Sequence, residues 1–298
     1  MVVPAAAFQP RLLSAFVGDG SFLSSANSLH SLFSSIPGKK HVSMPTLRTF
    51  SGLSDFLFNK RKVDAVPSEK REPLKPGKVS PYRPVPDHIQ RPPYLNSKKP
   101  PKISGAPQIH DKNGIESMRS SGRLAAKVLQ YAGTLVKDGD IINIDVTVYL
   151  KGYHGDTSAT FFVGDVDEQA KNLVQVTRDC LDRAISICAP GVEFNKIGKT
   201  IHDLADKHHF GVVEQFVGHG VGRFFHSDPV ILHYRNNVRG RMVLNQTFTI
   251  EPMLTIGSIH PIMWDDDWTV VTEDGGLSAQ FEHTILITED GVEILTQC

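Results

Sequence analysis

The chain has 298 residues, of which 40% are hydrophobic, so it can bury a sizeable core as one large domain or two small ones. Lysine with arginine and aspartate with glutamate both total 32, which argues against a nucleic-acid or membrane surface as the main partner. The three cysteines form no CxxC pair, so a disulfide framework is excluded, and no apolar run is long enough to span a bilayer. We therefore expect a soluble protein from a reducing compartment.

Residues 1–54 have the composition of an organellar transit peptide. They are rich in serine, alanine, leucine and phenylalanine, they contain Arg11 and Lys39, and Asp19 is their one acidic residue. Transit peptides are basic, hydroxylated and poor in acids, whereas a secretory signal would show a compact apolar core followed by small residues. We predict a transit peptide, in preference to an ordinary disordered terminus, and hence a chloroplast or mitochondrial location.

Residues 55–107 are predicted to form a proline-rich, basic linker. Eleven of the chain's 19 prolines lie here, and proline removes the backbone donor that a helix or a central strand needs, so the segment should be extended. Lys60, Arg61 and Lys62 make its start positively charged. We favour a solvated tether over a contact with RNA or the ribosome.

The folded domain is expected over residues 108–298. Apolar residues at spacings of three and four predict a helix over 112–136. Two strands, one of them rich in isoleucine and valine, follow at 141–150 and 155–163. Further elements are predicted as helices at 168–188 and 195–209 and strands at 212–217, 247–253, 280–288 and 291–295. This order indicates an α+β fold with hairpins, not a regular βαβ alternation.

Two aspartates lie in predicted strands, where β propensity disfavours them. Asp145 is inside the first strand and Asp156 opens the second. If Lys151-Gly152 forms a two-residue hairpin loop, Asp156 pairs with Thr147 and therefore lies on the same face as Asp145. Two carboxylates at close range repel each other unless a proton or a cation lies between them. The pair predicts a metal site.

Three more residues fit the same interpretation. Glu251 and Glu282 lie in later apolar strands, where an unpaired buried acid costs several kcal/mol. His219 stands in Gly218-His-Gly-Val-Gly222, where glycines let the backbone turn tightly and present the imidazole. Four carboxylates and one neutral imidazole carry a charge of −4, which balances two divalent cations. Oxygen-rich ligation with a single imidazole suits Mn, Fe or Co and tolerates Zn.

Six short segments together form a recognisable pattern. They are Asn143-Ile-Asp-Val-Thr147, Gly155-Asp-Thr157, Gly218-His-Gly-Val-Gly222, His226, Thr249-Ile-Glu-Pro252 and Gln280-Phe-Glu-His-Thr284. In order and spacing they resemble the type 1 methionine aminopeptidases, from about residue 110 to the C-terminus. Arg83-Pro-Val-Pro-Asp-His-Ile89 looks like the extension of organellar members, including those of plants. The resemblance implies the pita-bread (creatinase/aminopeptidase) fold, with the metals between two pseudo-repeated halves.

The resemblance also implies a role for each candidate ligand. Asp145 would chelate one metal, and His219 with Glu251 would ligate the other. Asp156 and Glu282 would bridge the pair. A bridging water or hydroxide would attack the carbonyl after the initiator methionine, and Glu251 would take and relay its proton.

Three residues would contact the substrate, which the resemblance implies is the N-terminal methionine of nascent organellar polypeptides. His226 resembles the family histidine that stabilises the charge developing on the scissile carbonyl. Phe225 and Trp268 match positions that line the methionine pocket, and an ordinary core aromatic is the alternative for both. The family also implies a monomer that acts without DNA or a membrane.

The resemblance breaks between Lys137 and Asp138. Family members have several dozen residues there, including strands of the first pseudo-repeat, most of the methionine pocket and a histidine that interacts with the scissile amide. This chain has no histidine between His110 and His154. The loss resembles a skipped exon or a gene-model error. We expect an incomplete first half, weak metal binding and slow cleavage, since a missing catalytic histidine costs roughly 10²–10⁴ in rate.

Two alternative functions stay open. An X-Pro peptidase of the same fold shares part of the ligand pattern, although Phe225 and Trp268 favour methionine. A catalytically inactive pita-bread protein that serves as a binding module would keep the ligands but lack turnover.

Overall fold

The computed structural model describes residues 72, 74–76, 84–95, 104–136, 141–266 and 268–297. The predicted transit peptide, most of the proline-rich linker and the junction of Lys137 with Asp138 lie outside these residues. Within the described part of the chain, no helix is long and apolar enough to cross a membrane.

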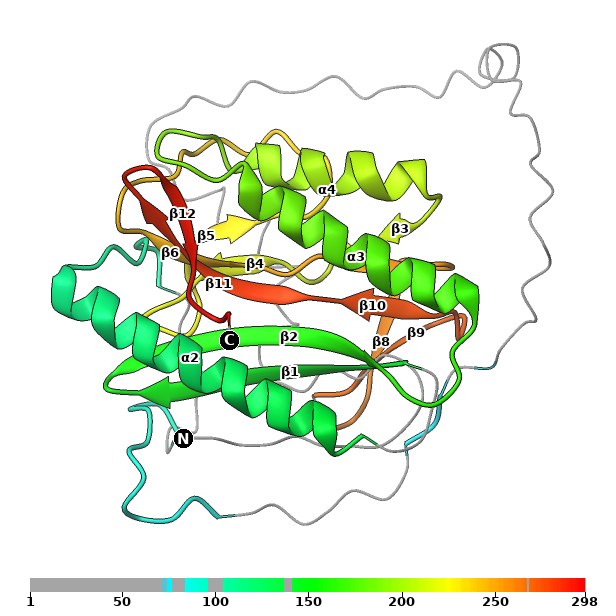
Figure 1. The fold of residues 1–298 in the computed structure, drawn as a ribbon, viewed down its shortest axis with the longest axis horizontal. Coiled ribbons are helices and arrows are strands. Elements are labelled where there is room, and N and C mark those ends of the chain that lie inside the picture. The colour runs from blue at the N-terminus through cyan, green and yellow to red at the C-terminus, as the bar shows by residue number, and fades with distance from the viewer. Residues whose placement is uncertain are drawn as a thin grey trace, which may run out of the picture. The chain divides into compact units, whose positions relative to one another are not determined.

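Helix α2 (Lys112–Thr134) begins where the apolar periodicity predicts. It is capped by Asp111, whose carboxylate accepts a hydrogen bond from the backbone N–H of Gly114 over 2.7 Å. The helix lies across strands β1 (Ile141–Leu150) and β2 (Tyr153–Phe162), as Figure 1 shows. Its apolar face packs against the even-numbered residues of β1, which are Ile142, Ile144, Val146 and Val148.

Strands β1 and β2 form an antiparallel hairpin with the predicted register. Lys151 and Gly152 make the two-residue loop, with φ values of 53° and 83°. Thr147 pairs with Asp156, and the alternation of a strand places Asp145 on the same face. This face is opposite to helix α2, so both aspartates point away from the small core beneath the helix.

Helices α3 (Glu168–Ser186) and α4 (Asn195–Lys207) cover the rest of the sheet on the same side as α2 (Figure 1). They pack against each other and bury a larger core than α2 does. Cys180 and Cys188 are buried in this core as free thiols. Other members of the core are Leu173, Ile197, Ile201, Phe248, Ile250, Ile285 and Ile287.

The main sheet has the strand order β1-β2-β11-β6-β4-β5, with β12 paired to β11. β1 is therefore an outer strand among the described residues. The other strands of this sheet are β4 (Gly218–Gly220), β5 (Ser227–Ile231), β6 (Thr247–Ile250), β11 (Glu282–Thr288) and β12 (Gly291–Ile294). Two smaller sheets contain β3 (Gly211–Val212), β7 (Met253–Thr255) and β10 (Ser278–Gln280), and β8 (Pro261–Met263) with β9 (Val270–Thr272).

The strands differ from the predictions mainly at prolines and sheet boundaries. The strand predicted over 247–253 is two strands, because Pro252 has no N–H to continue the ladder. The strand predicted over 280–288 is also divided, since the chain changes sheets at Phe281. Strand β3 is much shorter than the prediction of 212–217. Strands β5 and β8 were missed because each contains a proline, and β9 was missed as a short run.

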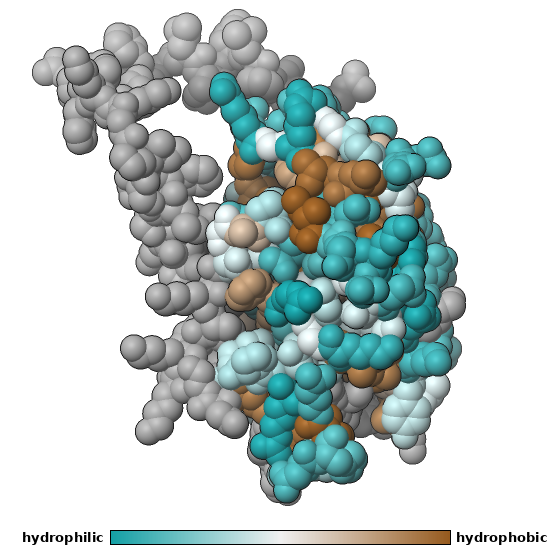
Figure 2. All heavy atoms as spheres, turned by 90° about the vertical axis from the view of Figure 1, so that its left-hand side faces the viewer, coloured by the Kyte–Doolittle hydropathy of each residue, from teal (hydrophilic) through white to brown (hydrophobic). Residues whose placement is uncertain are grey.

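On the side of the molecule shown in Figure 2, hydrophilic residues surround an apolar patch. Exposed apolar residues of the described chain include Ile109, Val243 and Leu244, and Ile109 forms a bridge with Gln246. Exposed apolar side chains are common on soluble folds, so this observation assigns no site by itself.

Candidate metal centre

The predicted ligands lie on the sheet face opposite to the helices, in neighbouring rows. Asp145, Ser158 and Glu282 form one row, because Ser158 pairs with Asp145 on β1 and with Glu282 on β11. Asp156 is two residues from Ser158 and lies in the next row, beside Thr147. Antiparallel pairing thus brings three carboxylates from three strands to one small area of the sheet.

Strand β4 and the end of β6 bring the remaining two ligands. The backbone N–H of His219 donates to Thr249 Oγ1 over 3.1 Å, and this hydroxyl donates to Glu251 Oε1 over 3.1 Å. His219 Nε2 lies 3.4 Å from Asp156 Oδ2 and 3.9 Å from Glu251 Oε1. One imidazole therefore lies between a carboxylate of strand β2 and one at the end of strand β6, on the same face of the sheet.

Gly218 and Gly220 flank His219 because neighbouring strands approach closely there. A Cβ atom at Gly218 would collide with the carbonyl oxygen of Thr249, and one at Gly220 with that of Asp228. Neither glycine has a positive φ. These glycines were predicted to make a tight turn, but the structure gives close strand packing as the reason for them.

Three of the candidate ligands bring their ligand atoms together. Asp156, His219 and Glu282 each offer one ligand atom, and the three atoms lie within 4.8 Å of one another. Among the described residues, Asp156 Oδ2, His219 Nε2 and Glu282 Oε2 are buried and accept or donate no hydrogen bond, although buried polar atoms normally do. His219 Nδ1 lies 3.2 Å from the Gly220 carbonyl oxygen, which only accepts, so the lone pair is on Nε2. A cation fits two carboxylate oxygens and an imidazole lone pair.

The crowding of buried charge shifts the pKa values of the site. Burial raises the pKa of Glu282 well above its usual value, and repulsion from Asp156 and Asp145 adds to the shift. Burial also raises the pKa of Glu251 to about 8, with Asp156 adding repulsion. Burial lowers the pKa of His219, but attraction to the carboxylates of Asp156, 3.4 Å from Nε2, and Glu251 outweighs it, so the net pKa is raised. Divalent cations would relieve this repulsion.

Hydroxyl and amide groups around the ligands fix their orientation. Thr147 Oγ1 donates to Asp156 Oδ1 over 2.6 Å, and Gln280 Nε2 donates to Glu251 Oε2 over 3.3 Å. Together with Thr249, these groups hold the ligand carboxylates as outer partners commonly do in metal sites. These orienting residues were not predicted from the sequence. The signal was present, because Thr147 and Thr249 each stand two residues from a ligand and so share its face.

The structure brings two of the three predicted substrate residues to the ligands. The rings of Phe225 and His226 are 3.9 Å apart, and that of His226 is 4.4 Å from the ring of His219. Burial, with His219 nearby, lowers the pKa of His226 well below its usual value, so its imidazole is neutral at neutral pH. Trp268 lies in the loop between β8 and β9, where its backbone N–H donates to Asp266 Oδ1 over 2.9 Å. Its place in a methionine pocket stays a prediction.

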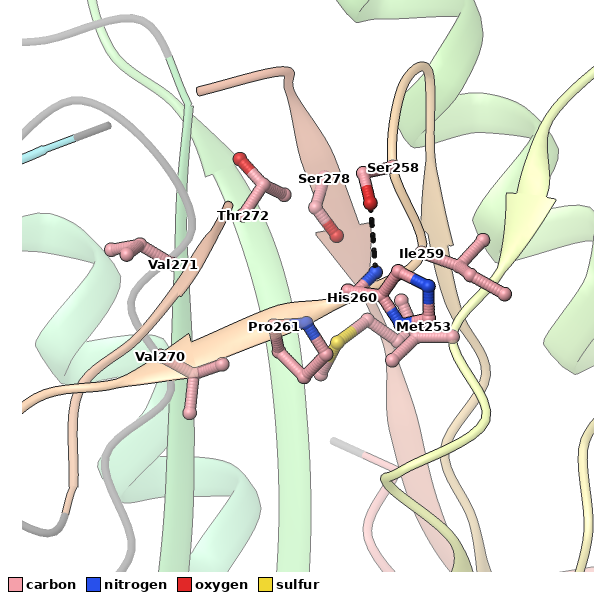
Figure 3. Close-up of a pocket in the computed structure, with 10 residues that line it drawn as sticks. Met253, Ser258, Ile259, His260, Pro261, Val270, Val271, Thr272 and Ser278 are labelled. Carbon is pink, nitrogen blue, oxygen red and sulfur yellow. Dashed lines mark hydrogen bonds between the residues drawn. The ribbon is translucent and has the colours of Figure 1, made fainter. Parts of the chain in front are cut away.

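A separate small pocket lies beside the β8–β9 hairpin, and Figure 3 shows apolar side chains such as Met253, Pro261 and Val270 around it. Its one ionisable lining residue is His260, whose backbone N–H donates to Ser258 Oγ over 3.2 Å. None of the described residues that line it is a candidate ligand. The pocket is therefore not the metal centre.

Known proteins match both the sequence and the fold. The model of metallopeptidase family M24 matches residues 110–289. Methionine aminopeptidase 1D, chloroplastic/mitochondrial, of Arabidopsis thaliana is 58% identical over 344 aligned positions, covering 97% of this chain and 98% of the relative. The crystal structure of methionine aminopeptidase from Thermotoga maritima superposes with a TM-score of 0.62 at 29% identity, covering 65% of this chain and 100% of that one. The crystal structure of methionine aminopeptidase from Rickettsia prowazekii superposes with a TM-score of 0.59 at 35% identity, covering 64% of this chain and 100% of that one.

These matches confirm the predicted α+β pita-bread fold. The alignment of 344 positions is longer than the 298 residues of this chain, so the Arabidopsis relative has residues that this chain lacks. The predicted position of a missing block, between Lys137 and Asp138, stays a prediction. The chain belongs to metallopeptidase family M24 and, within it, to the type 1 methionine aminopeptidases.

Proposed function

We propose that this chain removes the N-terminal methionine from nascent polypeptides in a chloroplast or mitochondrion, using two divalent cations such as Co, Mn, Fe or Zn. The observation that carries the proposal is the convergence of Asp156, His219 and Glu282, whose buried ligand atoms have no hydrogen-bond partners among the described residues. The name of the Arabidopsis relative, methionine aminopeptidase 1D, chloroplastic/mitochondrial, gives the activity and both compartments. The basic, acid-poor composition of residues 1–54 supports the same location.

Five buried side chains would hold the cations. Asp145 would bind one cation, His219 with Glu251 would bind the other, and Asp156 with Glu282 would bind both. When bound, such cations supply Lewis-acid activation of water and of the scissile carbonyl. Because all five residues are buried, bulk water is excluded and electrostatic interactions at the site are strengthened.

Other side chains would move the proton and bind the substrate. Glu251 would take a proton from the attacking water and pass it to the leaving amine, in an orientation that the Thr249 hydroxyl fixes from 3.1 Å. His226 would donate a hydrogen bond from its neutral imidazole to the developing oxyanion. Phe225, which stacks on His226, would line the methionine pocket together with Trp268.

A second candidate function is a metal-binding form with slow or absent turnover. Two observations favour it. The alignment with the Arabidopsis relative is longer than this chain, and β1 is an outer strand among the described residues. An outer strand has unpaired backbone groups along one side, which fits a first half that has lost neighbouring strands.

The deciding experiment incubates the purified full chain with Mn(II) or Co(II) and compares cleavage of Met-Ala-Ser with cleavage of Ala-Pro. We expect metal-dependent methionine release, roughly 10²–10⁴-fold slower than by the Arabidopsis relative because of the missing histidine. Glu282→Gln should abolish release, whereas Glu289→Gln, at an exposed acid, should not.

Other results would change the assignment. Two bound metal ions per chain without any methionine release would favour the second candidate. Cleavage of Ala-Pro in place of Met-Ala-Ser would contradict the proposal and assign an X-Pro peptidase. Methionine release as fast as that of the Arabidopsis relative would refute the expected loss of rate.

A further inference from the structure

Part of the proline-rich region has a defined shape. Within residues 84–95, two turns begin at Pro86 and Pro92 and are closed by backbone hydrogen bonds of 3.0 and 3.1 Å. The Arg91 guanidinium donates to the carbonyl oxygen of Val85 over 2.8 Å. Pro92 is buried. The two turns and the Arg91 hydrogen bond therefore give residues 84–95 a defined backbone conformation up to their last residues.

Tyr94, near the end of this segment, is bonded to His154 of strand β2. Tyr94 Oη and His154 Nε2 are 2.8 Å apart. His154 Nδ1 lies 2.8 Å from the carbonyl oxygen of Gly222, and a carbonyl only accepts, so the ring hydrogen is on Nδ1. Nε2 is then an acceptor, and the Tyr94 hydroxyl donates to it. The buried imidazole is held from both sides.

His154 connects Tyr94 to the candidate substrate residues. It stands two residues before Asp156 in β2 and therefore lies on the ligand face. Its ring stacks on Tyr94 at 5.8 Å and on Phe225 at 5.5 Å, with interplanar angles of 16° and 18°. Phe225 stacks in turn on His226. An aromatic stack thus runs from the proline-rich segment to the residues beside the metal ligands.

The chain before α2 contacts the same loop at a second, independent place. The Ser104 N–H donates to the carbonyl oxygen of His226 over 3.2 Å, and the Asp228 N–H donates to the carbonyl oxygen of Ser104 over 2.9 Å. Ser104 and Ser227 form a parallel bridge. The backbone around His226 is therefore held by Ser104, which lies in the segment predicted to be a linker.

We propose that Tyr94 is a positioning residue of the active site: its hydroxyl fixes His154, and the aromatic stack then holds Phe225 and His226 beside His219. The catalytic consequence rests on the proposed function, whereas the positioning can be measured without turnover. Residues 84–95 then form a wall of the site in addition to connecting it to the N-terminal region. Their removal would disturb the substrate loop even with every metal ligand intact.

The test compares the full chain with Tyr94→Phe, which keeps the ring and removes the hydroxyl. Tyr131→Phe, at a residue of α2 that is 64% exposed, is the matched control. Long-range ¹H–¹⁵N spectra of the histidine rings report the tautomer of His154 and the environment of His226. We expect an Nδ1–H tautomer for His154, shifted His154 and His226 signals in Tyr94→Phe, and unchanged signals in Tyr131→Phe.

Kinetics with Met-Ala-Ser provides the second readout. Loss of one buried hydrogen bond predicts a roughly two- to tenfold lower kcat/KM for Tyr94→Phe. Tyr94→Ala, which also removes the stacked ring, should have a larger effect. An Nε2–H tautomer of His154, or His226 signals that do not move in Tyr94→Phe, would overturn the proposal. If no form releases methionine, the proposed function fails, while the ring spectra still decide the role of Tyr94.

Discussion

The two halves of the fold bury very different cores, and yet both contribute residues to one candidate metal centre. The first half consists of α2 on β1 and β2 and has a small apolar cluster, to which Ala125 and Leu129 belong. The second half, with α3 and α4, has a much larger continuous cluster around Leu173 and Phe248. The candidate ligands are divided between them, with Asp145 and Asp156 in the first half and His219, Glu251 and Glu282 in the second.

This division predicts that metal binding and folding of the half with the smaller core are coupled. A ligand that binds only the folded state stabilises it by about 2.7 kcal/mol at a concentration of 100 times its Kd. In the proposed site the cations take ligands from both halves, so we expect much of this stabilisation to fall on the half whose own core is small. The first half should therefore depend on metal more strongly than the second.

The largest effect is expected from removing a ligand of the second half. Glu282→Gln should weaken Mn(II) binding by at least about 100-fold, since outer partners of metal ligands alone are worth about 10–100-fold. Without metal, the same change should raise the Tm, because it removes one of several buried carboxylates that repel one another. Calorimetric titration and thermal unfolding with and without EDTA measure both effects. A metal-dependent rise in Tm that persists in Glu282→Gln would contradict the assignment.

Core truncations compare the two halves directly. Leu129→Ala in the first half and Leu173→Ala in the second should each cost about 2–5 kcal/mol, because both side chains are buried. We expect Leu129→Ala to accelerate amide exchange in α2, β1 and β2 only, whereas Leu173→Ala should lower the stability of the whole domain. If Leu129→Ala accelerated amide exchange equally in both halves, the two halves would unfold as one unit.

A buried histidine connects the start of the first half to strand β6 of the second. His110 Nε2 lies 2.8 Å from Thr247 Oγ1, and burial, with Arg223 adding repulsion, lowers the pKa of His110 to about 4. Because the pKa in the folded state is below the unfolded value, neutral His110 stabilises the folded state fully above about pH 6.5. This stabilisation is lost as the pH falls towards 4, and the loss is at most about 3 kcal/mol of the free energy of unfolding. The free energy of unfolding in urea should differ less between pH 7 and pH 4.5 in His110→Gln than in the unchanged protein. The exposed His88→Gln is the control.

The smallest effect concerns an ion pair between the halves. Arg119 of α2 donates to both carboxylate oxygens of Glu293 in β12, over 2.9 and 2.8 Å, and both side chains are about one-third exposed. The coupling energy should be about 0.5–1 kcal/mol, because solvent screens the pair. A double-mutant cycle of Arg119→Met and Glu293→Gln measures it. A coupling energy of zero between Arg119 and Glu293 at low salt would show that this ion pair does not stabilise the contact between the halves.

The hairpin and the ligand set could be predicted because they depend on local rules. The Lys151-Gly152 loop fixed the register of β1 and β2, and this register placed Asp145 and Asp156 on one face. The acids in later apolar strands were recognised because burial makes an unpaired carboxylate costly. Helix α3 was also predicted close to its observed bounds from its periodicity.

Contacts between distant segments could not be predicted in this way. The hydrogen bond of Tyr94 to His154 joins residues 60 positions apart in the sequence. No local rule relates a proline-rich segment to a strand. The close packing at Gly218 and Gly220 depends on which strands become neighbours in the sheet. Pro252 divides one predicted strand between two sheets, which only the tertiary arrangement reveals.

Amide hydrogen exchange of the full chain with and without Mn(II) tests the central claim most directly. If one metal centre joins both halves, Mn(II) should slow exchange in β1 and β2 together with β4 and β11, most strongly in the first half. Glu282→Gln should abolish the effect in all four strands. Slower exchange confined to β4 and β11, or no change with metal, would contradict a site shared by Asp145, Asp156, His219, Glu251 and Glu282.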